Sequence, residues 1–291
     1  MATRTNIPYY ARKKALPEGV ESLPTVEDIL ASTDRISTEY NAYYVYRVGV
    51  HFVVKYGQSN GALLQEGENM LFVERSTTLL RIPKVYAVFH DEATGNDFIV
   101  QEYIPGQCLG SVWRDLTATQ KTAITSQLRQ GLDELRSIPS PGYYGGIWRQ
   151  PTRECNFEDP VKIWEPHNDV TISGPQETEE QWIDAMWRCA GSRVDPSQRD
   201  TLPQLRVDYH AAFKGHKPVF THACLFRSEM ILREDGVVVL IDWEYAGWYP
   251  TYWEYCSAMW MGDRWGSEIS EILDEFIPEL DGMIKHKSIL E

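Results

Sequence analysis

The segment from Phe220 to Glu244 constrains what this 291-residue chain can fold into more than any other. It begins with a polar loop, continues through two short apolar strands separated by Arg233–Gly236, and ends in an acidic turn that starts at Asp242. Apolar strands of this length, bounded by polar and glycine-containing turns, predict a paired hairpin. This order of a loop, a strand pair and an acidic turn is the layout of an active site.

Composition limits the class of protein and its partners. Hydrophobic residues make up 43% of the chain and charged residues 24%, values typical of a globular protein with one large domain or two lobes. The net charge of −14 argues against nucleic acid or an anionic membrane as a partner. The sequence shows no signal-peptide pattern and no membrane-spanning apolar run. Five irregularly spaced cysteines favour a reducing cytoplasm over disulfides or a zinc site. Composition gives no indication of the oligomeric state.

The first third of the chain predicts a small α+β lobe. Residues 1–35 predict an irregular lead-in with one short helix near 26–31. Lys55 ends the second strand of a predicted hairpin, and a helix carrying Glu66 and Glu68 follows it. In such a lobe a helix glutamate can hold a strand lysine toward phosphate oxygens. The predicted elements are a hairpin over 43–56, a helix over 63–74, and strands over 82–89 and 97–104, the last stopped by Pro105-Gly106.

The remainder of the chain is predicted to be mainly helical. Thr117 and Gln120 form a capping-box pattern, and apolar residues then recur at helical spacing up to Leu135. Residues 142–178, rich in glycine, proline and tryptophan, predict a long irregular insertion that borders a substrate cleft. Further helices are predicted over 179–190, 198–210, 251–261 and 267–289.

Several motifs together give the chain a resemblance to a known family. They are Val53-Val54-Lys55-Tyr56-Gly57, Glu68-Asn69-Met70, Ile82-Pro83-Lys84-Val85, Glu102-Tyr103-Ile104-Pro105-Gly106 and Ile241-Asp242-Trp243-Glu244-Tyr245-Ala246-Gly247. Over residues 43–260 the sequence resembles the aminoglycoside phosphotransferase and choline kinase group, particularly its fungal branch. Each motif is weak alone, and their order makes the match specific. The resemblance implies a two-lobed, protein-kinase-like α+β fold, with an N-terminal lobe over 1–105 and a mainly helical C-terminal lobe over 106–291.

The resemblance also implies roles for individual residues. Lys55 would contact the phosphates of ATP and pair with a helix glutamate, for which Glu68 is preferred and Glu66 is the alternative. The backbone of Glu102, Tyr103 and Ile104 would pair with adenine. Asp242 would bind Mg²⁺, and it would face Lys55 across a cleft between the lobes.

The catalytic loop departs from the family pattern of His-Gly-Asp, four variable residues and Asn. Cys224 replaces the aspartate that would accept the substrate proton, and Glu229 replaces the asparagine that would help to hold the metal. A neutral thiol is a poor base, whereas a glutamate still suits Mg²⁺. Ala223 stands where a tight turn usually has glycine. His222 is expected to brace the loop, and a nucleophilic Cys224 beside it is the less favoured alternative.

The leading interpretation is a kinase-fold protein that acts on a small organic molecule and is no longer an efficient ATP-dependent kinase. Acid–base chemistry by Glu229 and Asp242, in a pocket walled by Trp243 and Trp248, is one such function, and secondary metabolism is its expected context. The alternatives are a working small-molecule phosphotransferase that uses ATP and Mg²⁺, and a pseudokinase that serves as a binding or scaffold protein.

Overall fold

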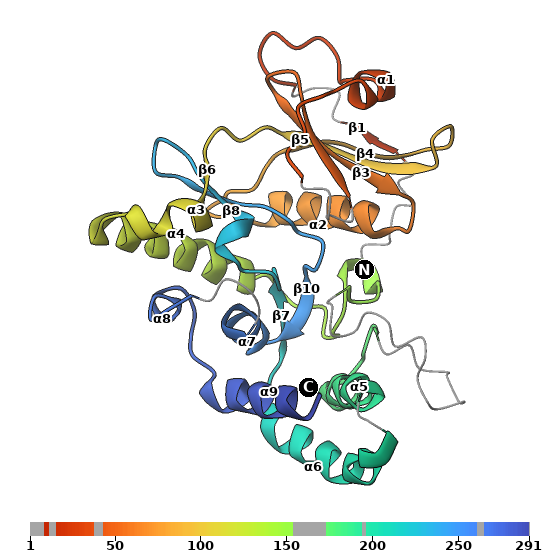
Figure 1. Ribbon diagram of the computed structural model, residues 1–291, viewed down its shortest axis with the longest axis vertical. Helices are drawn as coiled ribbons and strands as arrows, with labels where there is room; N and C mark the ends of the chain where they lie inside the picture. The colour runs from red at the N-terminus through yellow and green to blue at the C-terminus, as the bar shows by residue number, and fades with distance from the viewer. Residues whose placement is uncertain are drawn as a thin grey trace.

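The computed structural model describes residues 9–11, 16–37, 43–153, 173–193, 196–260 and 265–290. A β-sheet forms one end of the molecule and most of the helices form the other (Figure 1). No helix in these ranges is long and apolar enough to cross a lipid bilayer. Free thiols are present at Cys108, Cys189, Cys224 and Cys256, and Cys155 lies outside the described residues.

The sheet end is a five-stranded antiparallel sheet with the strand order β1-β4-β5-β3-β2. The strands are rich in Val, Tyr and Phe, which suit a half-buried pleated surface. The predicted hairpin and both later strands are present, and the short edge strand β1 in the lead-in was not predicted. The strands are β1 (Tyr9–Ala11), β2 (Tyr44–Val48), β3 (Phe52–Gln58), β4 (Val85–Asp91) and β5 (Asn96–Glu102).

Helices cover both faces of this sheet. Helix α2 (Ala62–Ser76) packs its apolar side, including Leu63 and Met70, between the sheet and the rest of the molecule. The short helix α1 (Val26–Leu30), which begins with a capping box at Thr25, inserts Ile29 into a separate apolar cluster on the other face. The sheet is thus buried on both sides, which fixes the register of the strand that carries Lys55.

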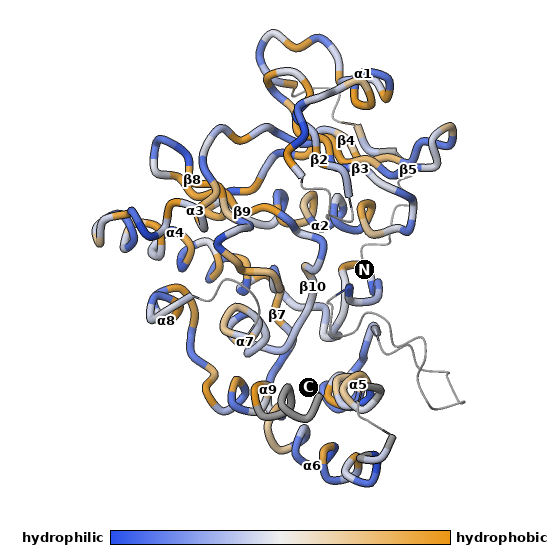
Figure 2. The backbone as a smooth tube through the Cα atoms, viewed as in Figure 1, coloured by the Kyte–Doolittle hydropathy of each residue, from blue (hydrophilic) through white to orange (hydrophobic). Residues whose placement is uncertain are grey.

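The other end of the molecule is built mainly of helices. The long helix α4 begins at the capping box of Thr117 and Gln120, as its sequence predicts. Orange apolar stretches on α4, α7 and β7 lie toward the interior in Figure 2. The helices are α3 (Leu109–Val112), α4 (Ala118–Arg136), α5 (Glu179–Arg193), α6 (Leu202–Phe213), α7 (Trp253–Trp260), α8 (Ile269–Ile272) and α9 (Ile277–Leu290).

The single helix predicted over 267–289 was wrong, because α8 and α9 are separate there. Leu273 is already extended, with a ψ of 158°, and α9 begins again at Ile277. Pro278 explains the break, because a proline is tolerated in the first turn of a helix and not in its interior.

Two short sheets connect the helical end to the cleft. Strands β7 (Pro218–Thr221) and β10 (Gly247–Pro250) pair with each other, and β6 (Gln107–Cys108), β8 (Met230–Leu232) and β9 (Val238–Leu240) form the second sheet. The predicted hairpin is β8–β9. Because β6 directly follows the end of the large sheet, this small sheet ties the crossover between the two ends to the loop that carries Cys224.

Candidate functional site

A lysine in the middle of β3 joins the two ends of the molecule. The ammonium nitrogen Nζ of Lys55 lies 2.8 Å from Oε2 of Glu66 on α2 and 2.8 Å from Oδ1 of Asp242, which follows β9. The structure therefore has Lys55 and Asp242 facing each other, as the sequence predicts.

The preferred helix partner of Lys55 was wrong, and Glu66, the alternative, pairs with it. Glu66 lies one turn from Ala62 and Met70, on the buried side of α2. Glu68 is about 200° further around the helix, and it accepts a hydrogen bond of 2.6 Å from Nε2 of Gln150. Two glutamates two residues apart cannot face the same strand.

Burial and ion pairing shift the pKa values of Lys55 and Glu66 in opposite directions. Burial raises the pKa of Glu66 to about 7, and Lys55 acts in the opposite direction. Burial alone would lower the pKa of Lys55, but Glu66 and Asp242 raise it well above its ordinary value. Lys55 is consequently a charged ammonium at neutral pH, held at the floor of a cleft.

A cavity of about 780 Å³ opens beside Lys55. Glu102, Tyr103 and Ile104 line one wall, at the end of β5, and Asp242 and Glu229 line the opposite side. Cavities of about 300–1,000 Å³ are typical of cofactor and small-molecule sites. The cavity is thus large enough for a nucleotide between Lys55 and the backbone of residues 102–104, which was predicted to pair with adenine.

The loop before β8 is fixed by its own histidine. The backbone N–H of Cys224 donates to Nδ1 of His222, so Nε2 carries the proton and donates to the carbonyl oxygen of Ile241, at distances of 3.2 Å and 3.0 Å. Burial lowers the pKa of His222 to about 4. His222 is therefore neutral and has both ring nitrogens engaged within the loop, and neither is free to activate a thiol.

Helix α7 holds the same loop from below. Glu254, which is fully buried, accepts backbone hydrogen bonds from His222 at 2.7 Å and from Ala223 at 3.0 Å. Ala223 has a φ of 66°, a left-handed conformation that favours glycine. The two bonds to Glu254 thus hold a turn that the alanine itself disfavours.

Cys224 occupies the position of the expected base as a neutral thiol. Its side chain is 7% exposed, and burial raises its pKa strongly, with Asp242 and Glu229 adding to the effect. A thiolate is therefore strongly disfavoured here. The pKa shift of Cys224 argues against a role as proton acceptor and against the covalent alternative.

Glu229 and Asp242 are brought together by the β8–β9 hairpin. The backbone N–H of Ile241 donates to the carbonyl oxygen of Glu229 at 2.9 Å, so the residue before β8 lies opposite the end of β9. Burial raises the pKa of Glu229, and the nearby charge of Asp242 raises it further. Two carboxyl groups, of which Glu229 has a raised pKa, thus line the same cavity.

Three carboxyl groups could hold a metal ion. One oxygen each of Glu66, Asp242 and Glu244 lie within 4.8 Å of one another. Mg²⁺ prefers oxygen ligands and the phosphate oxygens of a substrate, so the donor set fits Mg²⁺ with ATP, and charged Lys55 fits the phosphates. Glu244 was not predicted to bind metal, although it lies two residues after Asp242 in the acidic turn, and that spacing was the available signal.

Two tryptophans anchor the loop from outside. The guanidinium carbon of Arg227 lies 5.5 Å from the ring centroids of both Trp113 and Trp265. The indole Nε1 of Trp265 also donates to the carbonyl oxygen of Leu225 at 2.7 Å. This cation–π contact fixes the loop two residues before Glu229 and was not predicted.

Trp243 and Trp248 do not form the walls of the cavity, so that prediction was wrong. Their side chains are 0% and 3% exposed and belong to the main apolar core. Trp243 packs edge to face against His222, with ring centroids 4.6 Å apart. Tyr245 and Tyr43 line the cavity instead. Of the predicted insertion, Arg153 lines the cavity, and residues 154–172 lie outside the described part of the chain.

A β-strand lysine that meets a helix glutamate and an aspartate from the opposite half of the molecule characterises a two-lobed, protein-kinase-like fold. Comparison with protein families agrees, since residues 40–283 match the model of the phosphotransferase enzyme family. The chain therefore belongs to the phosphotransferase enzyme family.

Solved structures with the same fold include aminoglycoside phosphotransferases. The streptomycin–ATP ternary complex of APH(2")-IIa superposes with a TM-score of 0.60 at 14% identity, covering 88% of this chain and 83% of that one. ADP-bound APH(2'')-Ib gives 0.58 at 15% identity, with 88% and 80% covered. A thermostable mutant of APH(4)-Ia gives 0.55 at 15% identity, with 91% and 86% covered. At these identities the likeness shows the fold alone. No curated protein matches the chain by sequence.

Proposed function

We propose that this chain binds a nucleotide with Mg²⁺ in the cavity between Lys55 and Asp242, acts there on a small organic molecule, and transfers phosphate from ATP poorly. One observation carries the proposal. The Lys55–Glu66 pair has the geometry of a phosphate-binding site, whereas the neighbouring position for the base holds the buried, neutral thiol of Cys224.

Nucleotide binding is supported by Lys55, which reaches the cavity from the five-stranded sheet. Lys55 is charged and close to Asp242, so both can turn to phosphate oxygens and a metal ion. When bound, Mg²⁺ and ATP would supply the transferable phosphoryl group and neutralise its charge. Asp242, with Glu244 and Glu229 beside it, would hold the metal.

The catalytic half rests on the loop side. A positioned base typically contributes about 10²–10⁴-fold to the rate, and a thiol whose pKa is strongly raised cannot supply it. Phosphoryl transfer depends largely on positioning and on charge stabilisation, so a slow residual reaction is expected. We expect the native substrate to be a small molecule that contacts Glu229 and Asp242 in the wall of the cavity.

Acid–base chemistry is a second candidate, favoured by the position of Glu229 and Asp242 in the wall of the same cavity. Burial and the nearby Asp242 both raise the pKa of Glu229, which favours its protonated form as a proton donor. Glu229→Gln and Asp242→Asn would then each abolish turnover of the native substrate in folded protein. Turnover at the parent rate in both variants would contradict this candidate. Secondary metabolism in the cytoplasm is the setting we propose for either reaction.

Thermal unfolding tests the nucleotide half directly. A ligand that binds only the folded state raises the melting temperature, by an amount that grows with its concentration over Kd. Mg²⁺-ADP and Mg²⁺-ATP should both stabilise the protein, and steady-state release of ADP from ATP should stay slow with amine and alcohol acceptors. A melting temperature that millimolar nucleotide leaves unchanged would contradict nucleotide binding. Fast ATP turnover would contradict the loss of phosphotransfer.

A pseudokinase that serves as a binding or scaffold protein is distinguished by the same assays. Such a chain would be stabilised by nucleotide and would turn over neither ATP nor a small molecule. The variants Glu229→Gln and Asp242→Asn would then change ligand affinity only, because the parent protein would have no measurable turnover.

A further inference from the structure

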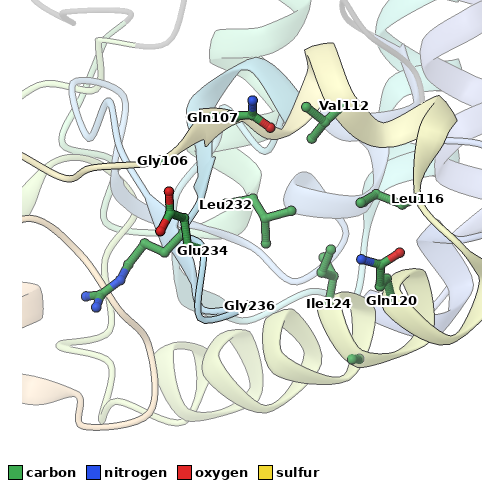
Figure 3. Close-up of a pocket in the computed structure, with 11 residues that line it drawn as sticks. Gly106, Gln107, Val112, Leu116, Gln120, Ile124, Leu232, Glu234 and Gly236 are labelled. Atoms are coloured by element: carbon green, nitrogen blue, oxygen red, sulfur yellow. The ribbon is translucent and has the colours of Figure 1, made fainter.

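A second cavity, of about 470 Å³, lies on the far side of strand β8 from the nucleotide cavity. Figure 3 shows it between the β8–β9 turn and helix α4, with Leu232 directed toward Leu116 and Ile124. Val112 completes the apolar wall. The volume is within the range of small-molecule sites, and the wall is large enough to bury the apolar body of a small ligand.

The polar groups at the rim define the chemistry of that ligand. Glu234 has no ion pair and no hydrogen bond within the described part of the chain, whereas its neighbour Arg233 is paired with Asp235 at 2.8 Å. The side-chain oxygen of Gln120 accepts from the backbone N–H and the hydroxyl of Thr117, at 2.9 Å and 2.8 Å. Gln120 therefore keeps only its NH₂ group for a ligand, and Glu234 offers the charge.

The wall between the two cavities is one strand thick. Along β8, Leu232 faces the second cavity and Ile231 faces the nucleotide cavity, because successive side chains of a strand point to opposite faces. Gly106, two residues after Ile104, lines both cavities. A Cβ at this position would lie 2.5 Å from the carbonyl oxygen of Leu232 and 2.7 Å from Cγ2 of Ile231. Residue 106 and β8 are therefore in close contact, with no room for a side chain between them.

We propose that the second cavity binds a small organic cation, a protonated amine on an apolar body, and that its occupation weakens nucleotide binding. The apolar body would lie against Leu232, Leu116 and Ile124, and the ammonium group would face Glu234. The ligand would share the one-strand wall of Leu232 and Ile231 with the nucleotide cavity, and its occupation would act on the nucleotide through that wall. The effect is reciprocal, so the nucleotide weakens amine binding by the same factor. The coupling rests on the proposed nucleotide site, and the amine site does not.

Three probes of matched shape test the ligand class: 2-phenylethylammonium, 2-phenylethanol and 3-phenylpropionate. Titration calorimetry and ligand-observed NMR on the full chain should show that affinity decreases from the amine to the alcohol to the acid. Since Glu234 is exposed, the preference for amine over alcohol should be about two- to fivefold. Glu234→Gln should remove that preference, and Glu92→Gln, a change in the distant β4–β5 turn, should keep it. Equal affinities for the amine and the acid in the parent protein would overturn the ligand class.

Filling the cavity tests the location. Ala123 lines the cavity from the exposed side of α4, so Ala123→Phe should abolish amine binding without loss of fold. Ala118→Phe, on an exposed position of α4 that does not line the cavity, is the matched control and should bind as the parent does. Unchanged amine binding in Ala123→Phe would overturn the site.

The coupling is measured separately. Saturating 2-phenylethylammonium should raise the Kd for Mg²⁺-ADP about fivefold, a typical size for coupling between two sites. In Lys55→Met the nucleotide should no longer bind while the amine binds as before. An unchanged Kd for Mg²⁺-ADP would overturn the coupling. Amine binding in a parent protein that binds no nucleotide would refute the proposed function and leave this site standing.

Discussion

The two sides of the cavity beside Lys55 are both held by buried contacts, but their residues differ in the chemistry that they can perform. On the sheet side, Lys55 is charged and paired with a buried glutamate. On the loop side, Cys224 is buried and neutral, yet the loop is held by Glu254, His222 and Arg227. In the proposed function, phosphate binding and proton acceptance therefore depend on separate elements of this fold. The loop keeps its hydrogen bonds although the thiol at its centre is a poor proton acceptor.

Restoring the loop side should have the largest effect. The double variant Cys224→Asp/Glu229→Asn supplies a carboxylate base and an amide ligand, and we expect ATP-dependent phosphotransfer to a suitable acceptor to rise about 10²–10⁴-fold. A coupled assay of ADP release over a panel of amino alcohols and aminoglycosides measures it. Cys224→Ala/Glu229→Asn lacks the base and should stay at the parent rate. Equal rates in the two double variants would show that the missing base does not limit the reaction.

Removing the ammonium group of Lys55 should lower both the stability of the protein and its affinity for nucleotide. Lys55→Met leaves Glu66 and Asp242 without their buried cation, and we expect the free energy of unfolding to fall by about 3 kcal/mol. Stabilisation by Mg²⁺-ADP should disappear as well. Urea denaturation with and without the nucleotide measures both. Lys214→Met, an exposed lysine, should change stability by less than about 0.5 kcal/mol. A Lys55→Met protein as stable as the parent would show that the pair is not a structural part of the cleft.

The anchor below the loop predicts a pH dependence. Burial raises the pKa of Glu254 to about 7 in the folded protein, from 4.5. Between these values the unfolded chain has lost the proton that the folded chain keeps, so the contribution of Glu254 to stability is greatest below pH 4.5 and falls as the pH rises to about 7.

The variant Glu254→Gln has no such titration. From pH 4.5 to about 7, the free energy of unfolding of the parent should therefore fall by on the order of 3 kcal/mol relative to that of Glu254→Gln. Any difference between the two proteins that does not depend on pH leaves this change unaffected. Unfolding free energies of both proteins at pH 4.5, 5.5, 6.5 and 7.5 measure the difference. A difference independent of pH would mean that Glu254 is ionised throughout.

The outer anchor of the loop should give the smallest effect. Arg227→Gln removes the cation from between Trp113 and Trp265, and we expect a loss of about 1–2 kcal/mol in the free energy of unfolding. Arg227→Lys keeps the charge and should lose less. Arg114→Gln, a nearby exposed arginine, serves as the control. If the Gln and Lys variants are equally stable, the cation contributes nothing to this contact.

The sequence predicted the residues whose place depends on local order along the chain. Lys55 was predicted on a strand and Asp242 just after another, and strand pairing brings both to the cleft. The prediction that Lys55 ends its strand was wrong, because β3 continues to Gln58. The choice between Glu66 and Glu68 required the orientation of α2. Both lie among apolar residues in the sequence, and helical spacing alone did not say which side of α2 faces β3. The break before α9 could have been predicted from Pro278.

Contacts between distant segments could not be predicted. Arg227, Trp113 and Trp265 come from three separate parts of the chain, and their meeting depends on how α3 and the segment after α7 pack around the loop. The burial of Trp243 has the same origin. A tryptophan beside a site aspartate has the same local sequence whether it faces a ligand or the core. Here Trp243 lies under the turn, donating from Nε1 to the carbonyl oxygen of Leu240.

Asn69, one turn after Glu66 on α2, ties this helix to the turn that carries Asp242. Its side-chain amide, fully buried, donates to the carbonyl oxygens of Trp243 and Ala246 at 2.9 Å and 3.2 Å, in the segment that follows Asp242. Moving this segment away from α2 would break both bonds and leave buried polar groups unpaired, so the contact resists separation of Glu66 from Asp242. The spacing of the charged groups at Lys55 is thereby held by an uncharged amide that does not line the cavity.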